Sequence, residues 1–260
     1  MMNDGTAKVV ARGVAVSYGS HRALHDVSLA VRDGSFVCLL GPSGCGKTTL
    51  LNAIAGFVAP SAGEILADGA RIRAPGADRG MVFQEYALFP WFTIEENVQY
   101  GPRLRNMNKA RLREISDHYL ELVHLAENKH RYPNQLSGGQ RQRVAIARAL
   151  ANQPNILLMD EPFGALDAMT RESLQEELLN IWEAERRTCI FVTHSIGEAV
   201  FLADTVVVMQ AHPGRIQVVM ENRLARPRDR TSDAFFAMYR RIDECLRASH
   251  VSSSLAGAGA

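Results

Sequence analysis

The chain has 260 residues, of which 47% are hydrophobic and 22% are charged. This composition provides enough apolar surface for one large or two small folded domains and excludes a mainly disordered chain. Because 29 Lys and Arg balance 28 Asp and Glu to a net charge of +1, the overall charge gives no general attraction to nucleic acid or to an anionic membrane surface.

The sequence carries no sign of secretion or of membrane insertion. The four cysteines are widely spaced and form no C-x-x-C pair, which is typical of a reducing compartment. Residues Met1–Val10 lack a basic segment followed by an apolar stretch, so we expect no secretory signal. Apolar runs such as Phe36–Leu40 are far shorter than the roughly 18 residues needed to cross a bilayer. We therefore expect a protein inside the cell whose membrane role, if it has one, is peripheral.

The predicted strands fall into two groups. Residues 9–16 and 23–31 alternate loosely between apolar and polar, which predicts a small antiparallel sheet that is half exposed to solvent. Short apolar runs flanked by turn residues occur over 36–40, 156–159, 189–192 and 205–209. Runs this apolar are typical of strands covered on both faces, and helical spacing between them predicts an α/β fold with a mostly parallel sheet.

Helical patterns dominate two other parts of the chain. The stretch over about 86–150 lacks a convincing buried strand, so we expect a helical subdomain inserted into a larger domain that spans 1–226. An amphipathic helix is predicted over 227–248. The Ser-, Gly- and Ala-rich residues 249–260 predict a disordered tail.

A phosphate-binding loop lies between a predicted strand and a predicted helix. Residues Gly41–Thr48 read GPSGCGKT and match the pattern G-x-x-x-x-G-K-[ST], directly after the strand over 36–40 and directly before a helix over 47–55. Glycines let consecutive backbone N–H groups close around phosphate oxygens, and the helix N-terminus adds partial positive charge. We expect Lys47 to reach the β- and γ-phosphates of a nucleotide and Thr48 to ligate Mg²⁺.

Two carboxylates follow a later apolar strand. Asp160 and Glu161 stand where the strand over 156–159 leaves the core. An Asp-Glu pair at a strand end is, on its own, commonly a turn or a helix cap. In a chain that also has a phosphate-binding loop, the pair predicts that Asp160 holds Mg²⁺ and that Glu161 is the general base.

The sequence LSGGQ at Leu136–Gln140 indicates a second anion site. Ser137 and Gln140 have the spacing of a capping box at the start of a predicted helix. A capping box does not account for Gly138 and Gly139, which expose backbone N–H groups at a helix N-terminus. Two phosphate sites with only one nucleotide motif indicate that each site serves the nucleotide of a different subunit.

With these motifs in this order, the chain resembles the ATP-binding subunit of ABC transporters over roughly residues 9–219. The resemblance implies a P-loop NTPase core with a mostly parallel sheet, an N-terminal antiparallel β subdomain and an inserted helical subdomain. It also implies hydrolysis of ATP with Mg²⁺ by a head-to-tail homodimer. Each ATP would then lie between one subunit's phosphate-binding loop and the other subunit's Ser137, Gly138 and Gly139.

The resemblance assigns further positions one by one. Tyr18 matches the aromatic residue that stacks on adenine, Gln84 matches the glutamine that contacts Mg²⁺ and the attacking water, and His194 matches the histidine that contacts the γ-phosphate. Asp167 matches the loop that crosses the dimer interface, although Gly164 stands where the family more often has Ser. The residues expected to be catalytic are Glu161, His194, Gln84 and Lys47. Those expected to bind the nucleotide are Tyr18, Gly41, Pro42, Ser43, Gly44, Cys45, Gly46, Lys47, Thr48, Thr49, Ser137, Gly138, Gly139, Gln140 and Asp167, and those expected to bind the metal are Thr48, Gln84 and Asp160.

An aromatic segment follows Gln84. Residues 85–93 read EYALFPWFT, and packing inside the helical subdomain accounts for some of Leu88, Phe89 and Trp91. The resemblance implies that this region forms the groove that receives the coupling helix of a membrane subunit. Residues 90–93 also resemble the nitrate, sulfonate and taurine import branch of the family.

The sequence therefore predicts an ATP-hydrolysing subunit that powers import of a small anion or of a sulfonate-, nitrate- or taurine-like solute. We expect a homodimer bound to integral membrane permease subunits on the cytoplasmic side of the inner membrane, working indirectly with a solute-binding protein. The alternative is a soluble ABC-type ATPase that acts on nucleic acid or ribosomes. Such proteins usually carry coiled-coil insertions or tandem cassettes, so we expect no nucleic-acid partner. A P-loop kinase or GTPase would leave LSGGQ unexplained, and the solute itself stays open.

Overall fold

A computed structural model of the chain describes residues 7–211 and 213–257, with side-chain environments as far as residue 248. The chain divides into two compact units. Unit 1 is formed by Met1–Gly76 and Thr188–Ala260, and unit 2 by Ala77–Arg187. None of the helices in the described part of the chain has both the length and the apolar character that crossing a membrane requires.

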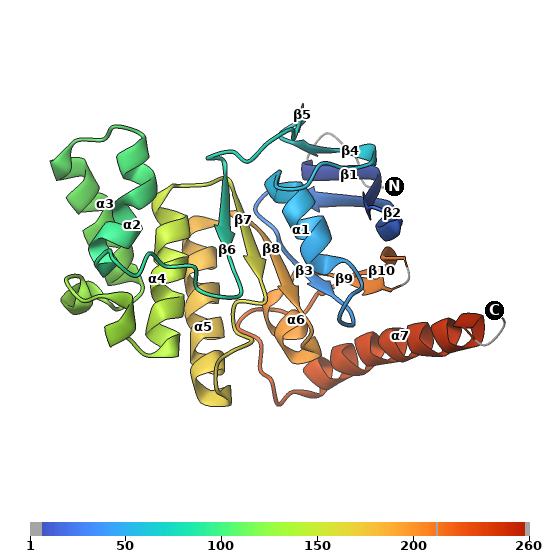
Figure 1. Cartoon of the computed structure of the whole chain (residues 1–260). Coiled ribbons are helices and arrows are strands. Elements are labelled where there is room, and N and C mark those ends of the chain that lie inside the picture. The colour runs from blue at the N-terminus through green and yellow to red at the C-terminus, as the bar shows by residue number, and fades with distance from the viewer. Residues whose placement is uncertain (1–6, 212, 258–260) are drawn as a thin grey trace. The chain divides into compact units, whose positions relative to one another are not determined.

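Unit 1 contains most of the strands (Figure 1). In chain order its elements are β1 (Ala7–Tyr18), β2 (His21–Arg32), β3 (Phe36–Leu40), α1 (Lys47–Ala55), β4 (Ala62–Ala67), β5 (Ala70–Arg71), β8 (Thr188–Thr193), α6 (Ile196–Leu202), β9 (Thr205–Gln210), β10 (Arg215–Glu221) and α7 (Asp233–Gly257).

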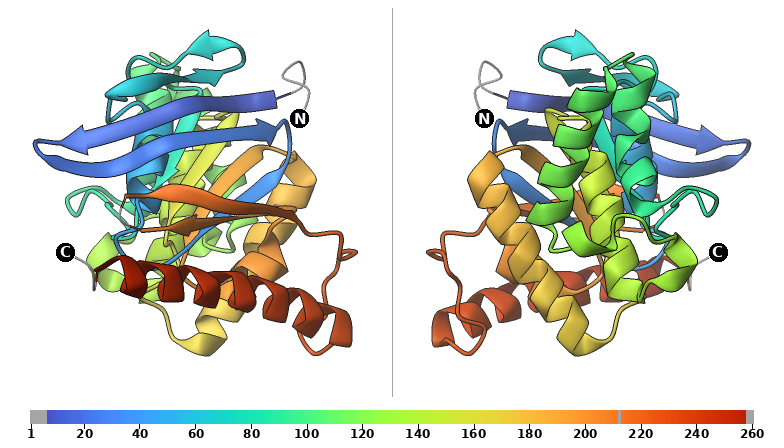
Figure 2. Two further views of the ribbon diagram at one scale, coloured as in Figure 1. Left: turned by 90° about the vertical axis from the view of Figure 1, so that its right-hand side faces the viewer. Right: turned by 90° about the vertical axis from the view of Figure 1, so that its left-hand side faces the viewer.

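The first sheet of unit 1 is antiparallel, with the strand order β2-β1-β4-β5. The long strands β1 and β2 run side by side as a ribbon, which is clearest in Figure 2. Alternate residues of β2, such as Val27, Leu29 and Val31, are buried while their neighbours face outward. The prediction of a small antiparallel N-terminal sheet is confirmed.

The second set of strands in unit 1 has the order β10-β9-β3-β8. Strand β3 pairs in parallel with both β8 and β9, whereas β10 pairs with β9 antiparallel. Every residue of β3 and of β8 is buried, because helices α1 and α6 contact these strands. Leu40 pairs with Thr193 on β8 and with Val208 on β9, so the carboxyl ends of the three strands meet at one edge. The α/β fold with a mostly parallel sheet is therefore confirmed.

Helix α7 corrects the prediction for the end of the chain. The amphipathic helix expected over 227–248 begins only at Asp233, and it continues to Gly257 through residues predicted to be disordered. The segment 249–256 contains neither Gly nor Pro, so nothing in it interrupts a helix that is already formed. Residues 258–260 of the predicted tail lie outside the described residues. Along its first turns α7 packs on α6 and β9 (Figure 2).

Unit 2 is mainly helical. Its elements are β6 (Arg79–Val82), α2 (Ile94–Leu104), α3 (Lys109–Leu122), the 3₁₀ turns η2 (Ala126–Asn128) and η3 (Pro133–Gln135), α4 (Gly138–Ala151), β7 (Ile156–Asp160) and α5 (Ala168–Glu185). Helix α4 contacts α2, α3, α5 and β6, so it is the helix around which unit 2 is assembled. Strands β6 and β7 pair in parallel, with Val82 opposite Met159.

Asp204 ties the start of β9 to its surroundings in unit 1. Its carboxylate accepts hydrogen bonds from the backbone N–H of Phe36 at 2.9 Å and from the guanidinium of Arg226 at 2.8 Å. The guanidinium of Arg228, which is almost fully buried, lies 3.9 Å away from the same carboxylate. One acidic side chain thus holds both the first residue of β3 and the segment that leads into α7.

We expect Asp204→Ala to lower the free energy of unfolding by about 2–4 kcal/mol, because it leaves a buried guanidinium without its anion and a buried N–H without its acceptor. The matched control is Asp243→Ala. Asp243 is equally exposed, at 30%, but only forms an i,i+4 pair with Arg247, so its loss should cost a few tenths of a kcal/mol. Urea titrations of both variants measure the difference, and equal losses would contradict the role given to Asp204.

Candidate functional site

The phosphate-binding loop connects β3 to α1, and its shape depends on glycines. Gly44 and Gly46 have φ angles of 77° and 90°, in the left-handed region that glycine adopts at little cost. A Cβ atom at Gly41 would lie 2.5 Å from the carbonyl oxygen of Met209, and a Cβ at Gly46 would lie 2.5 Å from a methyl group of Leu24. Residues packed around the loop therefore exclude side chains at Gly41 and Gly46.

Lys47, the first residue of α1, is buried. Its ammonium group donates hydrogen bonds to the carbonyl oxygens of Gly41 at 2.8 Å and of Pro42 at 3.1 Å, and it lies 4.0 Å from the sulfur of Cys45. These contacts hold the cation at the mouth of the loop, beside the N-terminus of α1. The arrangement concentrates positive charge where a phosphate group would bind.

The parallel register brings His194 to the same edge of unit 1. Because Leu40 pairs with Thr193, the residues that follow them, Gly41 and His194, leave neighbouring strands side by side. His194 is exposed, and Ser195 after it caps α6 by accepting a hydrogen bond from the backbone N–H of Glu198. Tyr18 ends β1 with its ring half exposed. Both residues are thus available to a ligand.

Gly214 belongs to the surroundings of the loop and was not predicted from the sequence. A Cβ atom there would lie 2.4 Å from the carbonyl oxygen of Cys45 and 2.5 Å from that of Ala23. Its backbone N–H donates to the carbonyl oxygen of Ala23 at 3.1 Å, and its own carbonyl accepts from His25 N–H at 2.9 Å. No motif marks this glycine, since the requirement arises from strands distant in sequence.

In unit 2 the carboxyl ends of β6 and β7 present the second group of predicted residues. Val82 pairs with Met159, so Gln84 and Glu161, each two residues further along, lie at the same edge of the strand pair. Asp160 is the last residue of β7 and is buried, whereas Gln84 is exposed. Carboxylate and amide oxygens gathered at one edge are ligands of the type that Mg²⁺ prefers.

Glu161 has an unusual backbone conformation. Its φ angle is 42°, in a region that residues other than glycine rarely occupy, and its carbonyl accepts a hydrogen bond from Gly164 N–H at 3.1 Å. Backbone strain of this kind persists only where the surrounding structure imposes it, and such residues cluster at functional sites.

The LSGGQ segment forms the N-terminus of α4 as predicted. Ser137 is the N-cap and makes a reciprocal capping box with Gln140. A Cβ atom at Gly139 would lie 2.7 Å from the methyl group of Thr170, so the absent side chain lets α4 approach α5 closely. The two glycines therefore allow close packing and also leave the backbone at the N-terminus of α4 uncovered by side chains.

Asp167 caps α5 near the same place. Its side chain accepts a hydrogen bond from the backbone N–H of Thr170 at 3.0 Å, and this bond lowers the pKa of the Asp167 carboxyl. Because Thr170 also touches Gly139, unit 2 brings the predicted interface aspartate close to the LSGGQ segment.

An aromatic cluster follows Gln84, formed by Phe89, Trp91, Phe92 and Tyr100, with ring centroids 4.5–6.2 Å apart. The buried amide of Asn97 binds the backbone carbonyl oxygens of Phe89, Phe92 and Thr93. Trp91 is 67% exposed, so the cluster presents an apolar surface rather than a closed core. Asn97 was missed in the sequence because a lone Asn inside a helix gives no signal.

Arg148 of α4 joins this segment to the LSGGQ helix. Its guanidinium donates hydrogen bonds to the carbonyl oxygens of Tyr86 and Ala87 and lies over the ring of Phe89. Arg141, also on α4, lies over the ring of Tyr86. The chain that leaves Gln84 is therefore attached to α4 at two points within unit 2.

The predicted site residues thus form two groups. Unit 1 holds the phosphate-binding loop, Tyr18 and His194, while unit 2 holds Gln84, the Asp160–Glu161 pair, the LSGGQ segment and Asp167. Apart from Tyr18, which ends β1 in the antiparallel sheet, the residues of each group come from separate parts of the sequence and reach one edge of the strands or neighbouring helix N-termini.

The loop geometry predicts that Gly46→Ala is more destabilising than Gly44→Ala. Both substitutions place alanine in the left-handed region, which costs about 1–2 kcal/mol, but only at Gly46 would the added methyl group strike Leu24. At Gly44 nothing lies within 4 Å of the added atom, which makes it the matched control. In urea denaturation without nucleotide, the free energy of unfolding of Gly46→Ala should be at least about 1 kcal/mol lower than that of Gly44→Ala. Equal stabilities would contradict the close packing described.

Comparison with known proteins assigns the family. Residues 24–164 match the family model described as ABC transporter. The chain is 50% identical over 215 residues to a nitrate import ATP-binding protein of Synechococcus elongatus, covering 82% of this chain and 78% of that protein. It is 48% identical over 222 residues to an aliphatic sulfonates import ATP-binding protein of Bacillus cereus, covering 85% and 87%.

A solved structure supports the same family assignment. The dimeric post-hydrolysis state of an ATP-binding cassette bound to ADP and Pi superposes with a TM-score of 0.72 at 34% identity, covering 84% of this chain and all of that one. The family and fold predicted from the motifs are confirmed. The chain belongs to the ABC transporter family, whose ATP-binding subunits are ATPases coupled to transport.

Proposed function

We propose that the chain is the ATP-hydrolysing subunit of an ABC importer for a small anion of the nitrate or sulfonate kind. The observation that carries the proposal is the identity of about one half to two import ATP-binding proteins, over more than three quarters of each. One relative is named for import of nitrate and the other for import of aliphatic sulfonates. The solute itself would be selected by other subunits.

The phosphate-binding loop would hold the nucleotide through its backbone. Helix α1 begins at the loop, so the first backbone N–H groups of the helix, together with the ammonium group of Lys47, would bind the phosphates. Binding would require Lys47 to exchange its hydrogen bonds to Gly41 and Pro42 for bonds to phosphate oxygens. The exposed ring of Tyr18 would stack on adenine.

The donor set suits Mg²⁺. The residues that the family pattern assigns to the metal, Thr48, Gln84 and Asp160, carry hydroxyl, amide and carboxylate oxygens, which are the hard ligands that this ion takes. When bound, Mg²⁺ would neutralise charge on the β- and γ-phosphates. The assignment of these three residues follows the family pattern.

Glu161 is proposed as the general base, and His194 as the contact to the γ-phosphate. Glu161 would accept the proton of the attacking water, while Gln84, at the same edge of β6 and β7, would orient that water. The strained backbone at Glu161 would fix the direction of its carboxylate before substrate arrives. Positioning and charge neutralisation then provide most of the rate enhancement.

A second copy of the chain would complete each ATP site. The N-terminus of α4, with Ser137, Gly138, Gly139 and Gln140, and the nearby Asp167 would meet the nucleotide held by the partner's loop. ATP would then add contacts that exist only in the closed dimer, so its binding favours closure and its hydrolysis favours opening.

The aromatic cluster around Trp91 is the surface proposed for the membrane subunit. Its exposed apolar rings suit a helix that projects from a permease toward the cytoplasmic face of the inner membrane. Arg148 would pass movements of this surface to α4, because its guanidinium holds the backbone at Tyr86 and Ala87.

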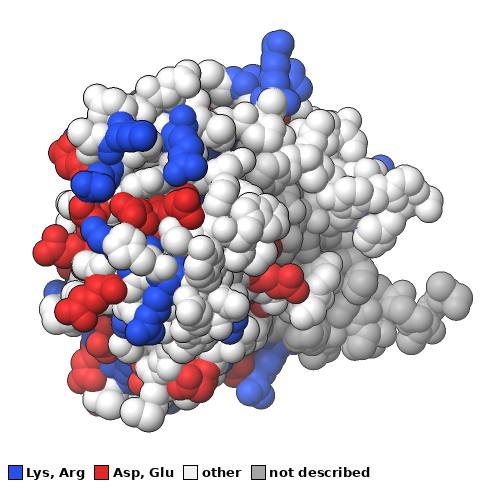
Figure 3. Space-filling model, turned by 60° about the vertical axis from the view of Figure 1, so that its left-hand side comes forward, with Lys and Arg blue, Asp and Glu red and all other residues white. Residues whose placement is uncertain are grey.

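The face of the molecule shown in Figure 3 gives no support to the alternative of an ATPase acting on nucleic acid. On the face shown in Figure 3, Lys and Arg side chains are interspersed with Asp and Glu. Proteins that bind nucleic acid without sequence preference gather positive charge on one face or stripe.

The proposal predicts that Glu161→Gln binds ATP normally but hydrolyses it roughly 10²-fold more slowly, because the general base is lost while the phosphate contacts stay. The control is Glu172→Gln, an exposed glutamate on α5, which should hydrolyse ATP at the normal rate. Lys47→Ala should instead weaken nucleotide binding and hydrolysis together. Steady-state phosphate release and binding of a fluorescent ATP analogue measure both quantities. Near-normal turnover in Glu161→Gln would remove Glu161 from its role.

Purification in mild detergent from native membranes tests the importer assignment. We expect a polytopic membrane protein to co-purify in near-equal amount with the tagged chain, as mass spectrometry would detect. Trp91→Glu should reduce that recovery while leaving nucleotide binding unchanged, because it places a charge in the apolar contact. Recovery of the wild-type chain only in the soluble fraction would contradict the proposed coupling to a membrane subunit.

A further inference from the structure

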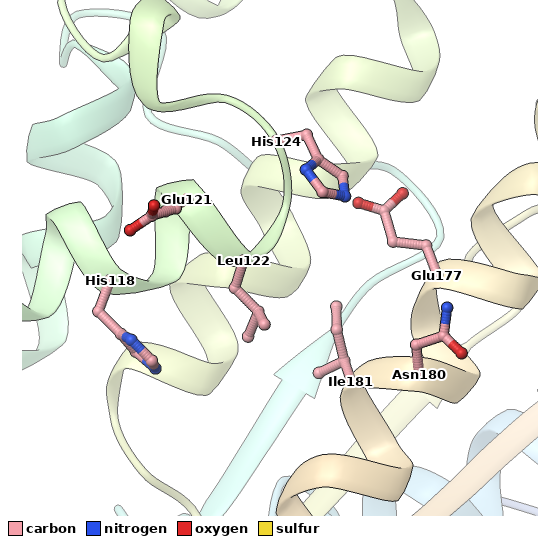
Figure 4. Close-up of a pocket in the computed structure, with 7 residues that line it drawn as sticks. All are labelled: His118, Glu121, Leu122, His124, Glu177, Asn180 and Ile181. Carbon is pink, nitrogen blue, oxygen red and sulfur yellow. The ribbon is translucent and has the colours of Figure 1, made fainter.

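Two arginines near the start of α4, Arg141 and Arg143, differ in how their charge is balanced. Nε of Arg143 lies 2.9 Å from a carboxylate oxygen of Glu177, which lines the pocket between α3 and α5 and also faces His124 (Figure 4). The guanidinium of Arg141 forms no ion pair and donates no hydrogen bond within the described part of the chain, and its Nε is screened from solvent. The positive charge of Arg141 is therefore not neutralised by unit 2.

The position of Arg141 favours an anion at the N-terminus of α4. Arg141 is the fourth residue of this helix, and the first turn contains no acidic residue. Because a helix N-terminus already has partial positive charge, a cation there raises the electrostatic energy unless an anion lies nearby. Asp167 approaches the same end, but its carboxylate accepts a hydrogen bond from the backbone N–H of Thr170. An anionic ligand would balance the guanidinium and the helix end together.

Tyr86 lies along the first turn of α4, with its hydroxyl group at the helix N-terminus. The guanidinium carbon of Arg141 is 5.2 Å from the centroid of the Tyr86 ring, and a Cβ atom at Gly138 would lie 3.1 Å from the Tyr86 hydroxyl oxygen. Arg148, two turns further along α4, holds the backbone carbonyl of Tyr86. These contacts direct the hydroxyl group toward the first residue of α4.

The Tyr86 hydroxyl lies beside groups that can only donate. The free backbone groups at the start of a helix are N–H donors, so they offer no acceptor to the proton of a hydroxyl group. Among the described residues, none accepts a hydrogen bond from this hydroxyl. A phosphate oxygen at the N-terminus of α4 would accept from the hydroxyl group and from the backbone N–H groups at once.

We propose that the Tyr86 hydroxyl, positioned by Arg141, donates a hydrogen bond to the terminal phosphate of the ATP that the partner copy holds. The inference rests on the proposed function, in which the N-terminus of α4 meets that nucleotide in the closed dimer. Because hydrolysis favours opening, the group that α4 must recognise is the phosphate that hydrolysis removes. Tyr86 then helps to distinguish ATP from ADP, which lacks the acceptor.

The test is ATP-driven dimerisation of the full-length chain, measured by sedimentation equilibrium at several protein concentrations. The parent is Glu161→Gln, which should retain ATP, and the test variant adds Tyr86→Phe. This change keeps the ring beside Arg141 but removes one charge-assisted hydrogen bond at each of the two ATP sites, so the dissociation constant of the dimer should rise at least about tenfold. The matched control is Tyr239→Phe in the same parent. Tyr239 is 38% exposed on α7, and its change should alter the constant by less than about twofold.

Two measurements on the monomer distinguish a ligand contact from a structural role. In dilute solution, where each copy is alone, the Tyr86→Phe variant should bind ATP within about twofold of the parent, because its phosphate-binding loop is intact. Its urea midpoint without nucleotide should equal that of the parent, since the hydroxyl group has no partner in the described part of unit 2. A lower midpoint would give the hydroxyl group a structural role and overturn the inference.

The outcome for the dimer separates this inference from the proposed function. If the parent dimerises with ATP and Tyr86→Phe leaves the dissociation constant unchanged, the role of Tyr86 is overturned and the proposed closed dimer stands. If the parent itself does not dimerise with ATP, both are overturned.

Discussion

The parallel pairing of β3 with β8 and β9 is the constraint on which the phosphate-binding loop depends. The register sets Leu40 opposite both Thr193 and Val208, so the carboxyl ends of the three strands lie at one edge. The loop that follows β3 must therefore fit between the segments that follow β8 and β9. The carbonyl oxygen of Met209 and a methyl group of Leu24 occupy the positions that side chains at Gly41 and Gly46 would need. Gly41 and Gly46 of the GPSGCGKT pattern are thus required by neighbouring residues of unit 1 as well as by the proposed contact with phosphate.

In unit 2 the predicted site residues depend on helix α4, as the phosphate-binding loop of unit 1 depends on the pairing of β3. Arg148 fastens the segment after Gln84, Gly139 allows the contact with α5, and Arg143 pairs with Glu177 beside the α3–α5 pocket. The LSGGQ segment at its N-terminus is therefore connected to each of these features by a single rigid helix. In unit 1, Asp204 likewise connects separate elements, because its carboxylate bonds to the first residue of β3 and to the segment before α7.

Much of this arrangement could be predicted from the sequence. The continuous apolar runs identified β3, β7, β8 and β9, because strands covered on both faces need no polar alternation, and the helix over 47–55 was predicted with its observed bounds. Strands β4 and β5 were missed, since one reads AGEILA and the other has two residues, and neither has the β-branched pattern that marks a strand. Gly214 and Arg148 were missed because their partners are distant in sequence. Helix α7 was predicted too short because a polar Ser-rich stretch resembles a linker, although it contains nothing that stops a helix.

The contact between Gly139 and Thr170 has a thermodynamic consequence. Because a Cβ atom at Gly139 would lie only 2.7 Å from the methyl group of Thr170, the absent side chain lets the N-termini of α4 and α5 pack closely. The N-cap hydrogen bonds of Ser137 and Asp167 fix the first turn of each helix. The conformational entropy needed to arrange these two helix ends is therefore lost when unit 2 folds, not when a ligand arrives. The phosphate contact proposed for these two N-termini would then spend little of its free energy on ordering their own loops, and the remainder would be available for a larger rearrangement.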